Sequence, residues 1–380
     1  MVKLAISDSQ TNSRTATFSG HWVNNKHTNV EAIQHVDNAD LLIYAVHDDG
    51  WTKMVGFKQS GERIDGRYVH GNVTLDNTCV SKAWDSPLGK NVGEDYYTVD
   101  CLDLVNTHVS DHIITCELNY GLGNQLFIIF ATIAYAYRHR CQFRLPNHQG
   151  SPSRPHYWES MFIGLKPYIQ NHNHCHAIHE RGCFTLTTFP NPSHTHTKLF
   201  GHFQHAGYFN EYKENICTLL GIRKFQQDLL STYPIAHCIS LHFRLGDYKN
   251  NPNYHPITPL AYYTQALQTI LDLAPGTHHV VKYCYELEDE EEIKTRVMCL
   301  SKQFPNMKFE PVPTTLPDWQ QLIYMSNCEH NIIANSTFSW WAAYFNQNPD
   351  KIVCAPKKWL GDNSNQDGLF LDNWKIIEIK

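Results

Sequence analysis

Long apolar segments are missing from this sequence of 380 residues. The N-terminus has no apolar core of the roughly 7–15 residues that a signal peptide needs. The most apolar run, Leu126–Tyr137, is well short of the ~20 residues that cross a membrane. The sequence therefore predicts a cytoplasmic chain without an export signal or a membrane anchor.

Paired cysteine motifs and an excess of basic residues are missing as well. The 12 cysteines contain no CxxC pair, so in a cytosolic chain we expect reduced thiols rather than a disulfide framework. Lys and Arg number 31 against 37 Asp and Glu, and this slightly acidic balance argues against a general nucleic-acid-binding protein. Charged residues make up only 18% of the chain and aromatic residues 12%, which predicts folded domains rather than disorder.

The charge is uneven along the chain, and this predicts a division into three parts. Residues 1–112 hold 9 Lys and Arg against 15 Asp and Glu, so they carry the whole net charge of −6. Their glycines recur between short apolar runs such as Ala39–Val46, which is typical of a small β-rich module. We expect the remainder to form two α/β halves, 113–234 and 235–380, with residues 146–200 as an irregular connection.

A strand candidate, Ile113–Glu117, is followed by a glycine-rich turn and then by a predicted apolar helix, Leu126–Arg140. The glycines and amides of the turn are Gly121, Gly123, Asn124 and Gln125. The turn is neither a P-loop nor a dinucleotide fingerprint, because GKS or GKT is missing and Leu126 occupies the third glycine position. The amides can hydrogen-bond sugar hydroxyls or phosphate oxygens, while a purely structural turn fits the pattern equally well.

An alternating strand, His237–Phe243, leads directly into Arg244. Arg244 therefore lies at the carboxyl end of a predicted strand, where open α/β sheets bind their ligands. Its planar guanidinium can bond two phosphate oxygens at once. The alternative is a surface arginine that forms a weak ion pair with Asp247.

Two helix starts offer further polar groups. Asn335-Ser336-Thr337 precedes a predicted helix over 338–345, and the exposed amides of a helix start bind anions. Asp318 precedes another predicted helix, and both sets of residues are compatible with simple capping. The histidine-rich stretch His172–His179 lacks the spacing of a standard zinc site, so we expect no metal.

Four motifs occur in order and together resemble one known family. They are GLGNQLF at Gly121–Phe127, KLFGHFQHAGYF at Lys198–Phe209, HFRLGDY at His242–Tyr248 and NSTFSWWA at Asn335–Ala342. The set is similar to the α-1,2-fucosyltransferases of glycosyltransferase family 11, over about residues 113–375. The resemblance implies a GT-B-like α/β fold, with two Rossmann-like halves facing a cleft, and inverting transfer of fucose from GDP-fucose without an essential metal. It does not extend to residues 1–112.

The resemblance implies a donor site in the C-terminal half. His242 and Arg244 match the donor-binding motif, with Arg244 expected on the β-phosphate and His242 near the nucleotide. The stretch expected at the pyrophosphate comprises Asn335, Ser336, Thr337 and Phe338. Asp318 is assigned to the donor site as well.

In the N-terminal half, the resemblance places Gly121, Gly123, Asn124 and Gln125 opposite the fucosyl group. The acceptor side is less constrained, and we assign to it His202, Gln204, Tyr208 and His255. Vertebrate members of the family carry an N-terminal anchor that this sequence does not show. The chain therefore resembles a bacterial or viral enzyme, expected in the bacterial cytoplasm or in that of a host cell.

Cleavage of a fucosyl–phosphate bond builds negative charge on the departing GDP. Without a metal, the cation of Arg244 and the helix start at Ser336 can stabilise that charge. Asn124 and Asp247 complete our set of catalytic candidates. Asp247 or His255 can take the acceptor proton, Asp247 can instead orient Arg244, and an oxocarbenium-like transition state can proceed without a base.

Other functions fit the sequence less completely. A related GDP-sugar transferase with another donor sugar would carry the same motifs, whereas a glycan-binding protein would not need Asn124, Arg244 and Asp247 together. Leu126 in the broken fingerprint argues against a dehydrogenase. The sequence therefore predicts a galactoside α-1,2-fucosyltransferase of glycan synthesis, whose partners are GDP-fucose and a glycan acceptor.

Overall fold

The computed structural model describes seven short strands between residues 18 and 92, and residues 110–147, 150–151, 154–172, 174–235, 237–276, 280–361 and 366–379. Contacts between residues divide the chain into two compact units, Met1–Ser110 and Asp111–Lys380. The division falls two residues before the expected end of the acidic module at residue 112.

Short antiparallel strands make up the described part of the first unit. They are β1 Phe18–His21, β2 His27–Val30, β3 Leu41–Val46, β4 Thr52–Phe57, β5 Arg63–Ile64, β6 Trp84–Asp85 and β7 Asn91–Val92. β1 pairs with β2, β4 with both β3 and β5, and β6 with β7. The predicted strand Ala39–Val46 corresponds to β3, and these strands agree with a β-rich module.

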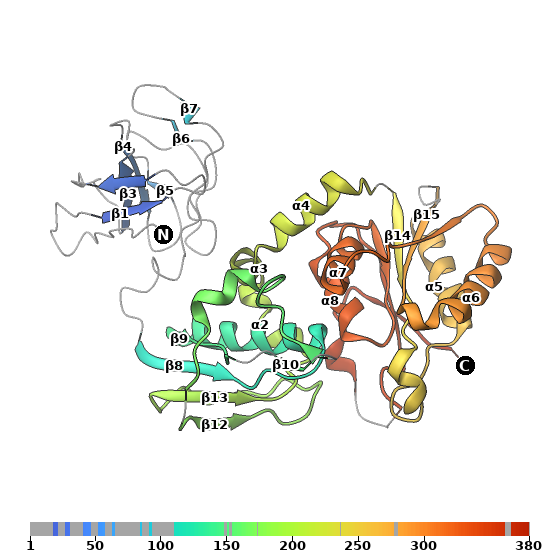
Figure 1. Cartoon of the computed structure of the whole chain (residues 1–380), viewed down its shortest axis with the longest axis horizontal. Helices are drawn as coiled ribbons and strands as arrows, with labels where there is room; N and C mark the ends of the chain where they lie inside the picture. The colour runs from blue at the N-terminus through green and yellow to red at the C-terminus, as the bar shows by residue number, and fades with distance from the viewer. Residues whose placement is uncertain are drawn as a thin grey trace. The chain divides into compact units, whose positions relative to one another are not determined.

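In the described part of the second unit there are two main sheets and one short hairpin, and the first main sheet has the order β12-β13-β8-β9 (Figure 1). Its strands are β8 Ser110–Cys116, β9 Cys141–Phe143, β12 His176–His179 and β13 His196–Phe200. β13 is parallel to both β8 and β12, and a hairpin of β10 Gly150–Ser151 and β11 Arg154–Pro155 lies outside this sheet. The prediction that residues 146–200 form only an irregular connection is therefore wrong. The two strands of this stretch that join the sheet, β12 and β13, are short and carry polar residues such as His176, His179 and Lys198, so the stretch lacks a continuous apolar run.

Helix α2, Leu122–Arg138, follows β8 and begins four residues earlier than predicted. Gly121 is its N-cap, so Gly123, Asn124 and Gln125 lie in its first turn rather than in a loop. Glycine lowers helix propensity by about 1 kcal/mol relative to alanine. The local sequence therefore predicts a turn at residues where the helix has already begun.

The second sheet, which contains β14 and β15 in Figure 1, has the order β16-β15-β14-β17-β18-β19, and every pairing in it is parallel. The strands are β14 Cys238–His242, β15 Val280–Cys284, β16 Lys308–Pro311, β17 His330–Ile332, β18 Val353–Pro356 and β19 Lys375–Ile377. The expected α/β class with two parallel sheets is thereby confirmed. Because all six strands are parallel, their carboxyl ends meet at one edge.

The remaining helices connect and cover these strands. The α-helices are α3 Lys213–Leu220, α4 Ile222–Thr232, α5 Leu260–Leu273, α6 Glu290–Gln303, α7 Asp318–Ser326 and α8 Thr337–Phe345. The 3₁₀ helices are η1 Ile163–Tyr168, η2 Ala206–Tyr208, η3 Asn210–Tyr212, η4 Gly246–Asn250, η5 Leu287–Asp289 and η6 Asp367–Leu369. Across the described residues, no helix is both long and apolar enough to cross a membrane. The ten cysteines of the described part of the chain are all free thiols.

An aromatic core joins α2, which follows strand β8 of the first sheet, to α8, which follows strand β17 of the second. The Phe130 and Trp341 rings are centred 4.5 Å apart, as are those of Phe127 and Trp340. Both tryptophans are fully buried. Truncating a buried aromatic residue of this kind costs about 3–5 kcal/mol, so this core fixes the starts of α2 and α8 relative to one another.

Candidate active site

Three strand ends of the second sheet bring charged and polar residues to the same edge. Arg244 follows β14, Glu286 follows β15, and Ser336 follows β17 and begins α8. In parallel sheets the ligand site lies outside these carboxyl ends. Glu286 is a site residue that sequence reasoning missed, although its place two residues beyond an alternating strand was a usable signal.

Arg244 is held by acidic side chains and by an aromatic ring. Its guanidinium forms ion pairs with Asp247 and Glu286 and lies 4.9 Å from the centre of the Tyr248 ring. The ion pair with Asp247 that sequence analysis offered as an alternative is therefore present. However, the Arg244 side chain is only 17% exposed, and its Nε has no hydrogen-bond partner among the described residues. Such a partly buried, incompletely bonded guanidinium differs from an ordinary surface ion pair.

The acidic groups at Arg244 keep it charged. Burial alone lowers the pKa of Arg244, but Glu286 and Asp247 outweigh burial, and its pKa lies above the ordinary value. Burial also raises the pKa of Glu286, against the opposing effect of Arg244. The site therefore has a permanent cation, and one of its two carboxylate partners, Glu286, is partly desolvated.

The turn two residues after Arg244 requires a glycine, Gly246. Its φ of +34° lies in a region that side chains rarely adopt, and an added Cβ would lie 1.7 Å from Oε2 of Glu286. Its backbone N–H donates to Oδ2 of Asp289 at 2.7 Å. The turn after β14 thus passes directly between two carboxylates.

Three carboxylates cluster near this turn, and carboxylate oxygens are ligands that a metal cation can use. The carboxylates of Glu286, Glu288 and Asp289 lie within 4.8 Å of one another. Glu286 pairs with Arg244, and Asp289 accepts from Lys249 at 2.6 Å as well as from Gly246. The protein's own cations therefore already serve two of the three carboxylates.

His242 lies beneath this edge as a neutral imidazole. It is 4% exposed, and burial, helped by Arg244, lowers the pKa of His242 to about 3. Its ring centre is 5.5 Å from that of Phe338, and its Nδ1 lacks a hydrogen-bond partner in the described part of the chain. The structure thus brings together His242 and Phe338, two residues expected near the nucleotide.

We expect this neutral histidine to make the protein sensitive to acid. The unfolded chain takes up a proton near the ordinary pKa of 6.5, whereas folded His242 does so only near about 3. Its contribution to the free energy of unfolding is therefore complete above pH 6.5 and falls as the pH drops toward 3, by up to about 1.4 kcal/mol per pH unit. Urea unfolding between pH 7 and pH 4 should show a steeper acid loss for the parent than for His242→Gln. Parallel curves for the two proteins would contradict this expectation.

The start of α8 lies directly against the start of α2. An added Cβ on Gly123 would be 2.5 Å from the carbonyl carbon of Thr337 and 2.6 Å from the backbone nitrogen of Phe338. The indole N–H of Trp341 donates to the Gly123 carbonyl at 2.8 Å. By contrast, an added Cβ on Gly121 would have no described atom within 4 Å. The structure therefore places two predicted donor segments side by side, with open space at Gly121.

Ser336 is the N-cap of α8, but its side chain makes no capping hydrogen bond within the described structure. The first amides of a helix have no intrahelical acceptor. In α8 the side chain of Ser336 does not accept a hydrogen bond from them. Asn335, in contrast, is fully engaged: Nδ2 donates to the carbonyls of Pro256 and Trp359, and Oδ1 accepts from Thr258. Asn335 therefore fixes the turn that presents the helix start.

The first turn of α2 is linked to the acceptor-side residues. Oδ1 of Asn124 accepts a hydrogen bond of 2.9 Å from Nε2 of Gln204. Gln125 has no exposed surface, and its Nε2 donates to the carbonyls of Tyr120 and Pro155, each at 2.8 Å. Asn124 thus remains a candidate for ligand contact, whereas Gln125 holds the surrounding backbone.

The other assigned residues lie in different environments. Tyr208 is buried, and its hydroxyl accepts from the Thr187 amide at 2.9 Å and donates to the Thr185 carbonyl at 3.2 Å, so it serves the local structure. The His255 ring stacks on Tyr248 at 4.5 Å, and Tyr248 lies against the Arg244 guanidinium, so His255 belongs to the surroundings of Arg244. Asp318 begins α7 and accepts a hydrogen bond from the hydroxyl of Tyr157.

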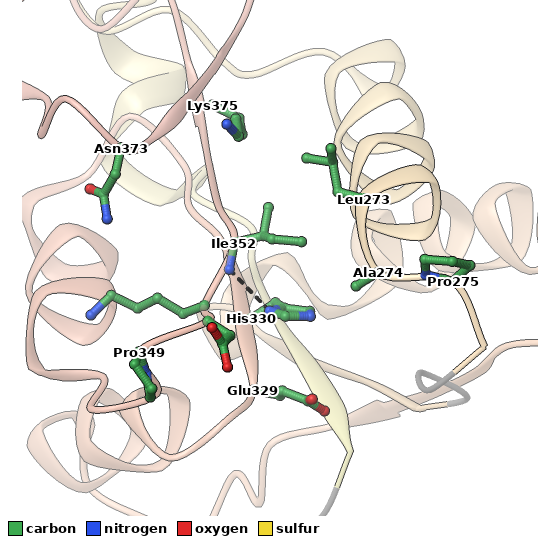
Figure 2. Close-up of a pocket in the computed structure, with 11 residues that line it drawn as sticks. Leu273, Ala274, Pro275, Glu329, His330, Pro349, Ile352, Asn373 and Lys375 are labelled. Carbon is green, nitrogen blue, oxygen red and sulfur yellow. Dashed lines mark hydrogen bonds between the residues drawn. The ribbon is translucent and has the colours of Figure 1, made fainter.

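A pocket of about 580 Å³ lies away from all of these residues. Figure 2 shows its lining near the end of α5 and the beginnings of β17, β18 and β19, including His330, Ile352 and Lys375. There the Ile352 amide donates to Nδ1 of His330 at 3.0 Å. The pocket therefore belongs to the opposite edge of the second sheet from Arg244.

Two curated proteins of Escherichia coli are similar in sequence to this chain. The O-antigen biosynthesis glycosyltransferase WbnK is 32% identical over 189 residues, which are 46% of this chain and 59% of WbnK. An alpha-1,2-colitosyltransferase is 28% identical over 166 residues, which are 43% of this chain and 56% of that protein. The chain thus spans less than two thirds of the length of either relative.

Solved structures are similar only at a low level. Arabidopsis thaliana FUT1 in complex with GDP aligns with a TM-score of 0.36 at 10% identity, covering 67% of this chain and 72% of FUT1. A glycosyl transferase of family 9 from Veillonella parvula also aligns with a TM-score of 0.36 at 10% identity, covering 70% of this chain and 86% of its own. Neither likeness bears on the activity.

The sequence profile described as glycosyl transferase family 11 matches residues 177–378, which is more than half of the chain. The matched region includes β14 with Arg244, the strand-end residue Glu286 and the helix start at Ser336. The chain belongs to glycosyl transferase family 11.

Proposed function

We propose that the chain transfers L-fucose from GDP-β-L-fucose to a sugar hydroxyl, with inversion, and that this is the 2-hydroxyl of a galactoside. The observation that carries the proposal is that three features lie together. They are the charged guanidinium of Arg244 with its unbonded Nε, the uncapped start of α8, and the open space at Gly121. A pyrophosphate needs the first two groups, and a sugar attached to it needs room beyond them.

The proposed mechanism rests on electrostatic stabilisation of the leaving group. As the fucosyl–phosphate bond breaks, negative charge grows on GDP, and Arg244 together with the first amides of α8 stabilises that charge. Asp247 and Glu286 already hold the guanidinium in place, so little reorganisation accompanies the reaction. Of the two candidate bases, His255 has a pKa that burial lowers below its ordinary value, against the opposing effect of Asp247, so at neutral pH its imidazole is free to accept a proton.

The donor sugar has one specific competitor. A relative carries the name alpha-1,2-colitosyltransferase, which supports an α-1,2 linkage and makes colitose the second candidate for the transferred sugar. Both candidates use the same leaving group in our proposal, so only the sugar pocket distinguishes them. A donor comparison therefore decides between the two.

The test is a screen of GDP-fucose with lactose and methyl β-galactoside, in the presence of a strong chelator and then with Mn²⁺ or Mg²⁺. We expect GDP release and an α-1,2-linked product by NMR, with turnover unchanged by the chelator, because Arg244 and α8 supply the required stabilisation. Turnover that depends on added metal would overturn the metal-independent mechanism and direct attention to Glu286 and Asp289. Glycan binding without GDP release would favour a non-catalytic protein.

A further inference from the structure

Tyr120 combines an exposed aromatic ring with an unusual backbone. It is 47% exposed and has a φ of +71°, directly before the N-cap of α2. A bulky residue in the left-handed region is rare, and such strain persists only where surrounding structure enforces it. Here the buried amide of Gln125 holds the Tyr120 carbonyl at 2.8 Å. The fold therefore keeps a large aromatic side chain in solvent at the edge of the site.

A second strained turn brings His202 against this ring. The ring centres of Tyr120 and His202 are 4.8 Å apart, with an angle of 32° between the planes. Phe203, the next residue, has a φ of +52°. Two segments far apart in the sequence thus adopt left-handed conformations at the same place.

Glu180 enforces this second turn. Its Oε2 accepts from the amide of His202 at 2.7 Å and from that of Phe203 at 2.9 Å. An added Cβ on Gly201 would lie 2.5 Å from Cβ of Glu180, so the carboxylate and the turn fit closely.

The paired rings lie beside the proposed donor site. Gln204, two residues after His202, hydrogen-bonds Asn124 in the first turn of α2, and Gly123 in the same turn touches Thr337 at the start of α8. Burial lowers the pKa of His202, so at neutral pH its imidazole is uncharged. An exposed phenol ring and a neutral imidazole together offer an apolar surface with polar edges.

We propose that Tyr120 and His202 form the platform on which the acceptor sugar lies, and that Gln125 and Glu180 are positioning residues for it. The proposal rests on the proposed function and extends it to the acceptor. A pyranose presents a face of C–H groups that packs on the electron-rich face of an aromatic ring, while its hydroxyls stay at the edge for hydrogen bonds. The ring pair would thus orient an acceptor hydroxyl toward the start of α8.

The experiment measures binding of methyl β-galactoside and methyl β-N-acetylglucosaminide to the GDP-loaded full-length chain by saturation-transfer NMR. We expect Tyr120→Ala to weaken glycoside binding at least tenfold, Tyr120→Phe to restore it, and GDP affinity to stay within twofold. Glu180→Ala should reproduce the loss, whereas Glu180→Gln should rescue it because its amide oxygen still accepts both backbone bonds. Ile163→Ala, which removes a 51% exposed apolar side chain from the same half, serves as the matched control.

The outcomes test the acceptor platform independently of the identity of the donor sugar. Unchanged glycoside binding by Tyr120→Ala, or no binding of either glycoside by the parent protein, would overturn the proposal. A fall in GDP affinity for Tyr120→Ala would also overturn it, because the ring would then contact the nucleotide. Glycoside binding that depends on Tyr120 without fucosyl transfer would support the platform and reject only the proposed donor sugar.

Discussion

Arg244→Lys should reduce kcat nearly as much as Arg244→Ala, by about 10²–10³-fold. The structure supplies the geometric reason, because one planar guanidinium contacts Glu286 through Nη1 and Asp247 through Nη2, which leaves Nε without a partner among the described residues. A lysine ammonium is a single point of charge on a flexible stem and cannot keep both contacts while it presents donors to a phosphate. GDP affinity should fall less than kcat, since bound GDP lacks the charge distribution of the transition state.

The measurement is kcat and GDP affinity for both variants, with melting temperature to exclude unfolding. Arg138→Lys is the matched control, because Arg138 also pairs with a carboxylate, Glu211, at 3.3 Å, but far from β14 along the chain. It should leave turnover unchanged. If Arg244 is only a structural ion pair, Lys should be tolerated and Ala should cost about 1 kcal/mol or less. A folded Arg244→Lys protein with near-normal turnover would therefore reject the phosphate role.

Gly123→Ala should destabilise the protein, although alanine is the better helix former. Gly123 lies in the first turn of α2, where propensity alone would favour alanine by about 1 kcal/mol. The added Cβ, however, would lie 2.5 Å from the Thr337 carbonyl carbon and 2.6 Å from the Phe338 nitrogen. These are backbone atoms that cannot rotate away, so α2 and α8 must separate at a cost of about 1–3 kcal/mol. Turnover should fall as well, because the displaced helix start is part of the proposed leaving-group site.

Gly121→Ala is the matched control for stability, since its added Cβ would have no described atom within 4 Å. Chemical unfolding of the two variants and the parent should rank Gly123→Ala well below the other two. Equal stability for Gly123→Ala and Gly121→Ala would show that the starts of α2 and α8 can move apart without a loss of stability. Retained turnover in a destabilised Gly123→Ala protein would instead separate the helix contact from the chemistry.

Local patterns were reliable where one apolar run corresponds to one element. The predicted strand His237–Phe243 matches β14, and the predicted helix over 338–345 matches α8 to within one residue at its start. Patterns failed where tertiary contacts override propensity. The first turn of α2 contains a glycine, and β12 and β13 each have few buried apolar side chains.

Single motifs also pointed to several candidate site residues, including Arg244, Ser336 and Asn124, because strand ends and helix starts are visible in a linear pattern. Of their partners, only Asp247, three residues after Arg244, was visible in the sequence. Glu286 and Asp247 both hold Arg244, but Glu286 is 42 positions away. Gln125 was assigned to the ligand from its amide chemistry and Asn335 from its motif, whereas their buried surroundings direct both amides to the backbone.

The sequence by itself determined the α/β class, the family and the position of the phosphate-binding candidates, because each depends on residues close together in the chain. Only the tertiary structure decided which side chains meet. Trp341 bonds the Gly123 carbonyl across 218 positions, and Glu180 bonds the turn that sets His202 against Tyr120. Such contacts depend on how helices and strands pack in three dimensions, and local propensities carry no information about that packing.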